Sequence, residues 1–352
     1  MAAARVAVAC LWLWSAANEG AEALSSSSNS GVITRRRLIL NRLHLISAQH
    51  SDNDHDDDEV DMEDADLLEI ARHEKVLFES ARSKMRAGTE ELMALPPSSA
   101  ALATARSAAD ALVQDGVVRL DRCVPTEACA SLADHVERVL HADLALVESG
   151  QLDPLTCFSS LLSASNRWDY KLPLDDVVLE ALKDLFGRSH GVLGPMMDGV
   201  VSDRAELFEL AAFYTAPGAK RQVVHADTLF TKEPVLFTAA LALQDVTESM
   251  GPTFFLPGTH TKAMHKRFDG ARTKDSLLLT TPHKLALLRA GDVSVYDSRT
   301  LHCGTDNCSA RRRILLYTTW KNPRAKERDD DFWNVASIRP EYAGKYKLKD
   351  FL

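Results

Sequence analysis

The chain has no apolar run long enough to cross a bilayer, which requires about 20 consecutive apolar residues. We therefore expect no stable membrane insertion. An excess of basic charge is also missing, because 41 Lys and Arg stand against 50 Asp and Glu in 352 residues, a formal net charge of −9. Ten of the acidic residues lie between Asp52 and Asp66, so the rest of the chain is nearly neutral. This balance argues against nucleic acid as the main partner.

Several motifs that would indicate other kinds of site are missing as well. The six cysteines form no C-x-x-C pair, which argues against a structural zinc site. Free thiols are expected, since a Cys303–Cys308 or Cys123–Cys129 disulfide would require an oxidising compartment. The chain contains no G-x-G-x-x-G, no P-loop, no G-x-S-x-G and no internal repeat. The sequence therefore offers no sign of a dinucleotide, nucleotide-phosphate or serine-hydrolase site of these types.

Residues 1–60 have the composition of a targeting segment followed by an acidic, disordered linker. Arg5 precedes an apolar stretch, and Ala21-Glu22-Ala23 resembles the cleavage site of a secretory signal peptide. Residues 24–50 contain no acidic residue and are rich in Ser and Arg, which is typical of an organelle transit peptide. We expect a location in the secretory pathway or an organelle, or in the cytoplasm if this segment is only a disordered tail.

Helical and β patterns divide the rest of the chain. Four helices are expected, from Ala65 to a stop at Gly88, from Ser98 to about Gln114, from Pro125 onward, and from Asp175 to Phe186. Seven strands are expected after Arg204, at Leu207–Tyr214, Gln222–Asp227, Val235–Asp245, Thr253–Leu256, Ala286–Leu288, Asp292–Tyr296 and Arg313–Trp320. Gly and Pro turns separate the strands, so we expect a mainly β sandwich or barrel with flanking α-helices. The predicted divisions are an N-terminal helical region (61–114), a main domain (115–325) and a C-terminal extension (326–352).

One H-x-D motif stands in a context where its two side chains could bind a metal ion together. Four such motifs occur, at His50–Asp52, His55–Asp57, His141–Asp143 and His225–Asp227. The first two lie in the acidic linker, and the third lies in a helical pattern, where residues i and i+2 point about 200° apart. In an extended chain, by contrast, the side chains of residues i and i+2 lie on the same face. His225 and Asp227 could therefore belong to the two-histidine, one-carboxylate arrangement of non-haem Fe(II) sites, with a surface polar pair as the alternative.

A second histidine and an arginine follow at a suggestive distance. His302 comes 75 residues after Asp227, and Arg313 opens the apolar strand RILLYTTW 11 residues later. An inward-pointing Arg at the start of such a strand needs an anionic partner, and its planar guanidinium suits a carboxylate. Arg311 and Arg312 are rivals for this role, or part of a solvated basic cluster.

These motifs, taken in order, resemble the phytanoyl-CoA dioxygenase family. The resemblance rests on QVVHAD, DVTESMGPTFFLPGTH, GDVSVYD and HCGTDNCSARRR, within a similarity that runs from about Asp115 to Trp320. It implies a double-stranded β-helix, a jelly-roll core of the cupin type, in an Fe(II)- and 2-oxoglutarate-dependent dioxygenase. It also implies that His225, Asp227 and His302 bind iron, that Arg313 holds 2-oxoglutarate, and that Tyr214 assists the co-substrate unless it is only a packed strand aromatic.

The reaction implied by the resemblance consumes O₂ and 2-oxoglutarate, releases succinate and CO₂, and hydroxylates a small organic or lipid-like substrate. Two alternatives remain, a jelly-roll binding protein without turnover and a cupin-like metal-dependent isomerase. His260, which follows a Pro-Gly turn, is expected to be structural. The segment from Arg167 to Lys171 could contact substrate, although a surface loop with one anchored Trp is the favoured interpretation. The sequence does not identify the substrate or the oligomeric state.

Overall fold

The structure is a computed structural model, and it describes residues 64–83, 94–95, 105–159, 166–187, 191–325 and 336–352. The proposed targeting segment, the acidic linker and the first two H-x-D motifs lie outside these residues. None of the described helices is long and apolar enough to span a bilayer.

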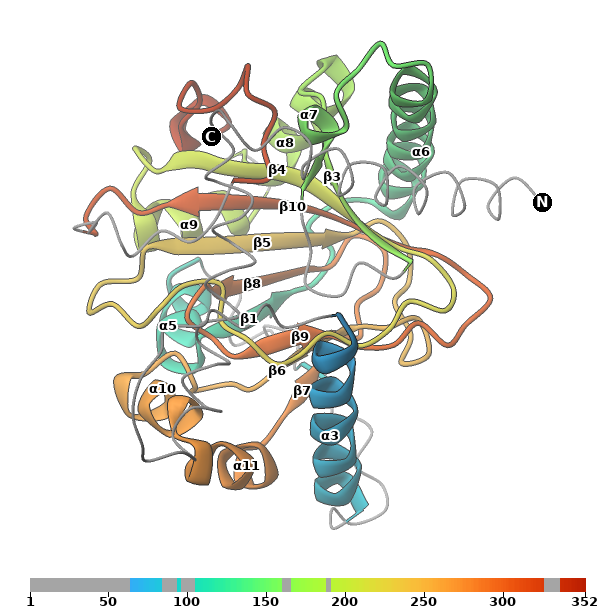
Figure 1. Ribbon diagram of the computed structural model, residues 1–352. Coiled ribbons are helices and arrows are strands. Elements are labelled where there is room, and N and C mark those ends of the chain that lie inside the picture. The colour runs from blue at the N-terminus through green and yellow to red at the C-terminus, as the bar shows by residue number, and fades with distance from the viewer. Residues whose placement is uncertain (1–63, 84–93, 96–104, 160–165, 188–190, 326–335) are drawn as a thin grey trace, which may run out of the picture.

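Two antiparallel sheets form the centre of the molecule (Figure 1). The larger sheet has the strand order β1-β8-β5-β10-β4-β3-β2, and the smaller has the order β7-β6-β9. The larger sheet contains β1 (Val117–Leu120), β2 (Phe158–Ser159), β3 (Arg167–Lys171), β4 (Glu206–Thr215), β5 (Leu236–Ala242), β8 (Val293–Asp297) and β10 (Arg313–Lys321). The smaller contains β6 (Thr253–Phe255), β7 (Lys284–Leu285) and β9 (His302–Gly304). The expected fold class, mainly β with flanking helices, is confirmed.

Helices cover one face of the larger sheet and lie beside the smaller one. The described helices are α3 (Asp64–Ser83), α5 (Ala105–Asp115), α6 (Thr126–Glu148), α7 (Pro154–Cys157), α8 (Asp176–Phe186), α9 (Leu193–Val201), α10 (Lys262–Asp269), α11 (Ala271–Thr280) and the short 3₁₀ turn η2 (Leu348–Asp350). Helix α8 agrees with its prediction, because Asp175 accepts a hydrogen bond from the backbone N–H of Val178 and Gly187 ends the helix. Helices α10 and α11 were not predicted, since α10 is only 8 residues long and buries only His265 and Phe268.

The two faces of β10 show why the larger sheet can carry a site. Ile314 and Leu316 pack into the main apolar core together with helices α5, α6, α8 and α9. Arg313, Leu315 and Tyr317 alternate with them and therefore lie on the opposite face. Leu315 packs with residues of the smaller sheet, so this second face points into the space between the sheets. Arg313 on that face therefore lies in the interior, between the two sheets.

Three sequence-based strand assignments require correction. Residues 222–227 form no strand, only an isolated bridge between His225 and His302. Strand β7 lies at Lys284–Leu285 and not at 286–288, because the backbone N–H of Leu287 turns back to the carbonyl of Leu285. The segment expected to be a surface loop is the buried strand β3, which pairs with β4 from Arg167 to Lys171. The charged residues of this segment suggested a surface loop, but in the structure their side chains point inward.

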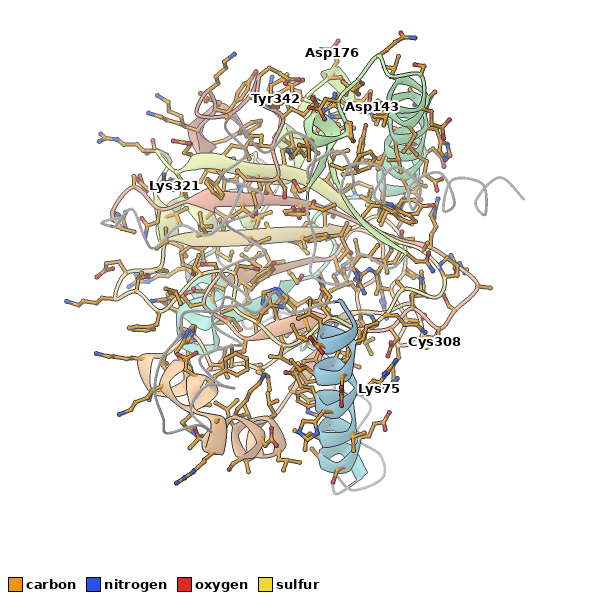
Figure 2. All side chains as sticks on the ribbon, in the orientation of Figure 1. Lys75, Asp143, Asp176, Cys308, Lys321 and Tyr342 are labelled. Carbon is orange, nitrogen blue, oxygen red and sulfur yellow. The ribbon has the colours of Figure 1, made fainter. Side chains whose placement is uncertain are left out.

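The described part of the C-terminal extension packs against the same core as the main domain. Ile338, Leu348 and Phe351 are buried there, and the rings of Trp320 and Phe351 lie 5.8 Å apart. Arg339 pairs with Asp143 of α6, which Figure 2 labels beside α7. Residues 336–352 are therefore part of the folded unit.

Residues 1–60 are expected to be dispensable for folding and activity. Their composition is that of a targeting segment followed by an acidic run with almost no apolar residues, and α3 begins only at Asp64. A chain that starts at Met62 should match the full-length protein in melting temperature and in turnover. A large loss of either property would show that the removed segment packs on the folded unit.

Candidate active site

One group of His and Asp side chains in the described part of the chain is placed to bind a metal ion. The ligand atoms of His225, Asp227 and His302 all lie within 4.8 Å of one another. The Nε2 atoms of both histidines lie 3.7 Å from Oδ1 of Asp227. Atoms that bind one ion at about 2.0–2.2 Å are themselves roughly 3–4 Å apart, so the three side chains can share an ion. Two histidines and a carboxylate with open positions suit Fe(II).

Backbone carbonyls orient both imidazole rings toward this centre. Nδ1 of His225 hydrogen bonds with the carbonyl of Val223 at 2.9 Å, and Nδ1 of His302 does so with the carbonyl of Thr300 at 2.9 Å. A carbonyl oxygen can only accept, so Nδ1 carries the proton in each ring and Nε2 offers its lone pair. Metal-binding histidines commonly donate such a hydrogen bond from the ring nitrogen that does not bind the metal. The residues present therefore fit a bound metal.

Backbone hydrogen bonds join the two segments that carry the ligands. His225 and His302 exchange N–H···O bonds of 2.9 and 2.8 Å, and the backbone N–H of Asp227 donates to the carbonyl of Ser298 at 2.8 Å. The extended chain around this bridge places His225 and Asp227 on one side. The strand predicted here was wrong, but the expected pairing of these two side chains holds, because the extended backbone that produces it is present.

Aromatic side chains pack beside the ring of His302. The ring centroids of Tyr296 and Phe255 lie 4.9 and 5.8 Å from that of His302, and 5.2 Å from each other. Burial, with a further contribution from the charge of Asp227, raises the pKa of Tyr296 well above its ordinary value. Tyr296 therefore stays a neutral phenol at physiological pH. An apolar shell of this kind limits the access of water to the metal position.

Two buried arginines lie side by side between the sheets. Arg313 of β10 and Arg167 of β3 are 2% and 3% exposed. Both donate to the hydroxyl of Thr215, from Nη2 of Arg313 at 3.0 Å and from Nη1 of Arg167 at 3.3 Å. Arg313 also donates to the carbonyl of Gly251, and Arg167 to the carbonyls of Lys220 and Thr305 at 3.2 and 2.9 Å. The hydrogen bonds of both guanidinium groups thus go to neutral oxygens.

The two buried guanidinium groups can together bind an anion. Burial lowers the pKa of Arg167 to about 10, and the pKa of Arg313 is lowered by burial and by the charge of Arg167. The Nε–H of each arginine has no hydrogen-bond partner among the described residues. A buried charge without a counter-charge is unfavourable, and a carboxylate bound to both groups would compensate for it. The site therefore suits a ligand with a carboxylate at one end.

Gly304 connects the arginine pair to the metal centre. It ends strand β9, which begins with His302. A Cβ atom at Gly304 would lie 2.5 Å from Nη1 of Arg167 and 2.7 Å from Oε1 of Gln222, so a side chain there would displace both groups. The guanidinium of Arg167 occupies the space that this glycine leaves, two residues beyond His302. Through Gly304, the guanidinium of Arg167 therefore lies against the strand that carries His302.

The other candidate residues lie elsewhere. Arg311 is exposed, and Arg312 forms an ion pair with Glu137 of α6. Tyr214 approaches Glu137 as well, with its hydroxyl 3.5 Å from Oε1, whereas its neighbour Thr215 contacts the arginine pair. Neighbouring strand residues point to opposite faces, so Tyr214 points away from the pair. The expected role of Tyr214 in co-substrate binding does not fit this placement, and the packed aromatic is the interpretation that remains.

Sequence reasoning considered Arg167 only within a segment that could contact substrate, and it did not place Arg167 beside Arg313. Its segment lies 58 residues before His225, with two helices between them, so spacing gave no indication of proximity. The alternation of Arg167, Asp169 and Lys171 with aromatic residues was the available signal, because it fits a strand with one polar face.

The remaining histidine and cysteine predictions agree with the structure. His260 hydrogen bonds with the carbonyl of Val113 at 3.1 Å, away from the metal group, which fits a structural residue. Asp143 of the helical H-x-D accepts from Tyr170 at 2.7 Å. All five cysteines of the described chain are free, so neither of the two disulfides considered above is formed.

Solved structures that are similar to this chain include the following three. The non-heme alpha ketoglutarate dependent epimerase SnoN from nogalamycin biosynthesis has 16% identity and a TM-score of 0.47, covering 62% of this chain and 82% of that chain. The carbocyclase SnoK from the same biosynthesis has 18% identity and a TM-score of 0.45, covering 62% and 86%. AviO1 from Streptomyces viridochromogenes Tue57 has 18% identity and a TM-score of 0.47, covering 63% and 96%. No curated protein matches the sequence significantly.

The family model of phytanoyl-CoA dioxygenase matches residues 112–315, more than half of the chain. The matched range contains the candidate metal ligands and both buried arginines, and it leaves out helix α3. The resemblance, the jelly-roll fold and the cofactors inferred from the motifs are thereby confirmed. The chain belongs to the phytanoyl-CoA dioxygenase family of Fe(II)- and 2-oxoglutarate-dependent oxygenases.

Proposed function

We propose that this protein hydroxylates a small organic or lipid-like substrate, with Fe(II) bound by His225, Asp227 and His302. In this reaction 2-oxoglutarate and O₂ are converted to succinate and CO₂, and the second oxygen atom of O₂ enters the substrate as a hydroxyl group. The observation that carries the proposal is the combination of a carbonyl-oriented His-Asp-His group with a buried arginine pair. Bound iron supplies the oxidising chemistry, and the protein supplies placement and a dry site.

In this proposal the arginine pair binds the distal carboxylate of 2-oxoglutarate. Arg313 and Arg167 bring two positive charges, and each has an Nε–H that no described residue accepts. Thr215 holds the two groups together through one hydroxyl. A dicarboxylate anchored here can direct its 2-oxo acid end toward the histidines, because β9 leads from Gly304 back to His302. The chain's own contribution is therefore the orientation of the co-substrate.

The arginine pair also separates this function from its alternatives. A cupin-like isomerase that needs only a metal has no use for two buried cations that form no ion pair with any described residue. A binding protein without turnover would hold the same ligands but release no succinate. The first alternative is disfavoured by Arg167 and Arg313, whose burial is costly unless an anion binds. The second is decided by experiment.

The test is 2-oxoglutarate turnover by the purified protein under Fe(II). Lipid, CoA-ester, amino-acid and sterol candidates are screened for substrate-dependent release of succinate, and mass spectrometry then looks for a product that has gained one oxygen atom. We expect at least one class to stimulate succinate release and to gain oxygen. A protein that binds Fe(II) and 2-oxoglutarate but never releases succinate would be the silent binding protein. A stimulating substrate that is changed without gaining oxygen would contradict hydroxylation.

A further inference from the structure

Helix α3 lies outside the range matched by the family model, yet it packs against both segments that carry the candidate metal ligands. Figure 1 shows α3 beside β6, β7 and β9, with α11 next to it. Leu67 and Ala71 of α3 pack on Val223, and Phe78 lies 4.3 Å from Phe254 between ring centroids. The helix thus covers residues 222–225, the segment that bridges to β9 at the metal centre. Covering such an outer segment satisfies or shields the backbone groups that it leaves unpaired.

Glu74 makes the most specific of these contacts. Its side chain is 1% exposed, and Oε2 accepts a hydrogen bond of 2.7 Å from the backbone N–H of Val224, the residue before His225. Oε1 forms an ion pair with Nζ of Lys274 on α11 at 3.0 Å. A buried carboxylate is therefore held between a second helix and the backbone of the metal-binding segment.

The backbone direction explains why Val224 needs this partner. The N–H groups of Gln222 and His225 donate to the carbonyls of Gly304 and His302, on the side of β9. The N–H of Val224 donates instead to the carboxylate on the side of α3. A buried N–H without an acceptor is unfavourable, so the chain would shift to find one if Glu74 were absent. Such a shift would move His225, since it is the next residue.

A second contact reaches the segment that follows His302. Lys75 pairs with Asp306 at 2.8 Å, and Asp306 also accepts from the backbone N–H of Arg221 at 3.0 Å. Figure 2 shows Lys75 on α3 and Cys308 in the loop that follows β9. The pKa of Lys75 is raised, chiefly by its hydrogen bond to Asp306. Neighbouring residues of one helix turn, Glu74 and Lys75, thus touch the chain on both sides of the histidine bridge.

We propose that Glu74 is a positioning residue for the metal centre, and that α3 is part of the catalytic unit although the family model does not include it. The inference rests on the proposed metal ligands. The hydrogen bond from Val224 fixes the path of residues 223–225, and thereby the distance between the rings of His225 and His302. The ion pair with Lys274 neutralises the buried carboxylate that provides this bond.

Two double variants of the full chain separate the hydrogen bond from the charge. Glu74→Gln with Lys274→Met removes the ion pair but leaves a side-chain oxygen that can accept from Val224. Glu74→Leu with Lys274→Met removes the same charges and the acceptor as well. Both are titrated anaerobically with Fe(II), and hydrogen exchange is followed at residues 223–226. His73→Ala is the control on α3, because it breaks an exposed contact with Asp275 that does not involve the metal-binding segment.

The Gln variant and His73→Ala should keep the Fe(II) affinity of the wild-type protein. The Leu variant should bind Fe(II) roughly 10- to 100-fold more weakly, the range for partners that support a metal ligand from outside, with faster exchange at 223–226. Equal affinities of the two double variants would overturn the inference. If the Leu variant does not fold, Glu74→Asp, which keeps the charge but withdraws the acceptor, decides by the same titration. A wild-type protein that binds no metal would instead contradict the proposed function.

Discussion

Replacement of His302 or His225 by alanine is expected to abolish stoichiometric Fe(II) binding and all 2-oxoglutarate turnover. Wild-type protein should bind one Fe(II) per chain. Each histidine offers a lone pair at Nε2 because its Nδ1–H donates to a backbone carbonyl. Loss of a partner that merely supports a ligand weakens metal affinity about 10- to 100-fold, so loss of a ligand itself should exceed that range. Metal analysis after anaerobic desalting, together with Fe(II) titration, measures the effect.

His141→Ala is the matched control for this experiment. It removes a histidine from another H-x-D motif, but the exposed His141 lies on α6 and does not belong to the His-Asp-His group. Its Fe(II) affinity and melting temperature should equal those of the wild type. Unchanged iron affinity in His225→Ala or His302→Ala would refute the assigned ligands, whereas equal losses in all three variants would indicate unspecific damage.

Replacement of Arg313 by lysine is expected to raise the Michaelis constant for 2-oxoglutarate about ten- to a hundredfold. A lysine cannot reproduce the bidentate contact of a guanidinium with a carboxylate. A hydrogen bond to a charged partner contributes about 1.5–3 kcal/mol, which corresponds to that change in affinity. Arg167→Lys should act in the same direction. The combined variant should lose less than the sum of both effects, because the two arginines bind one carboxylate.

A thermal measurement tests the same site without turnover. The wild-type melting temperature should rise when 2-oxoglutarate is added to the metal-loaded protein, since a ligand that binds only the folded state stabilises it. Arg313→Met should show little of this rise. Without ligand, Arg313→Met should be at least as stable as wild type, because it removes one of two adjacent buried like charges. A strong loss of stability without ligand would mean that Arg313 mainly supports the fold.

Three neighbouring substitutions serve as controls for Arg313. Arg311→Lys and Arg312→Lys should change the Michaelis constant for 2-oxoglutarate little, because Arg311 is exposed and Arg312 pairs with Glu137 on the other face of the sheet. Tyr214→Phe should also leave it unchanged. Equal effects at all three arginines, or the largest effect at Arg311, would be incompatible with the arrangement of β10 described here.

The sequence by itself determined the fold class and the identity of the candidate metal ligands. An H-x-D pattern in extended chain constrains two side chains to one face, and this local rule needs no knowledge of the rest of the molecule. Strand alternation likewise separated Arg313 from Arg312, since neighbouring strand residues point to opposite faces. The ordered motifs between His225 and Arg313 then indicated the family, which the match over 112–315 confirms.

Only the tertiary structure decided what surrounds those ligands. Arg167 reaches Thr215 through pairing of β3 with β4, and Glu74 reaches Val224 across 150 residues. Neither contact has a local periodicity, because sheet pairing and helix packing join segments whose separation in sequence is arbitrary. Tyr214 shows the same limit, since its distance from Arg313 in sequence did not reveal which face of the sheet it occupies. Local rules fix which way a side chain points within its own segment, whereas its partner depends on how distant segments are packed.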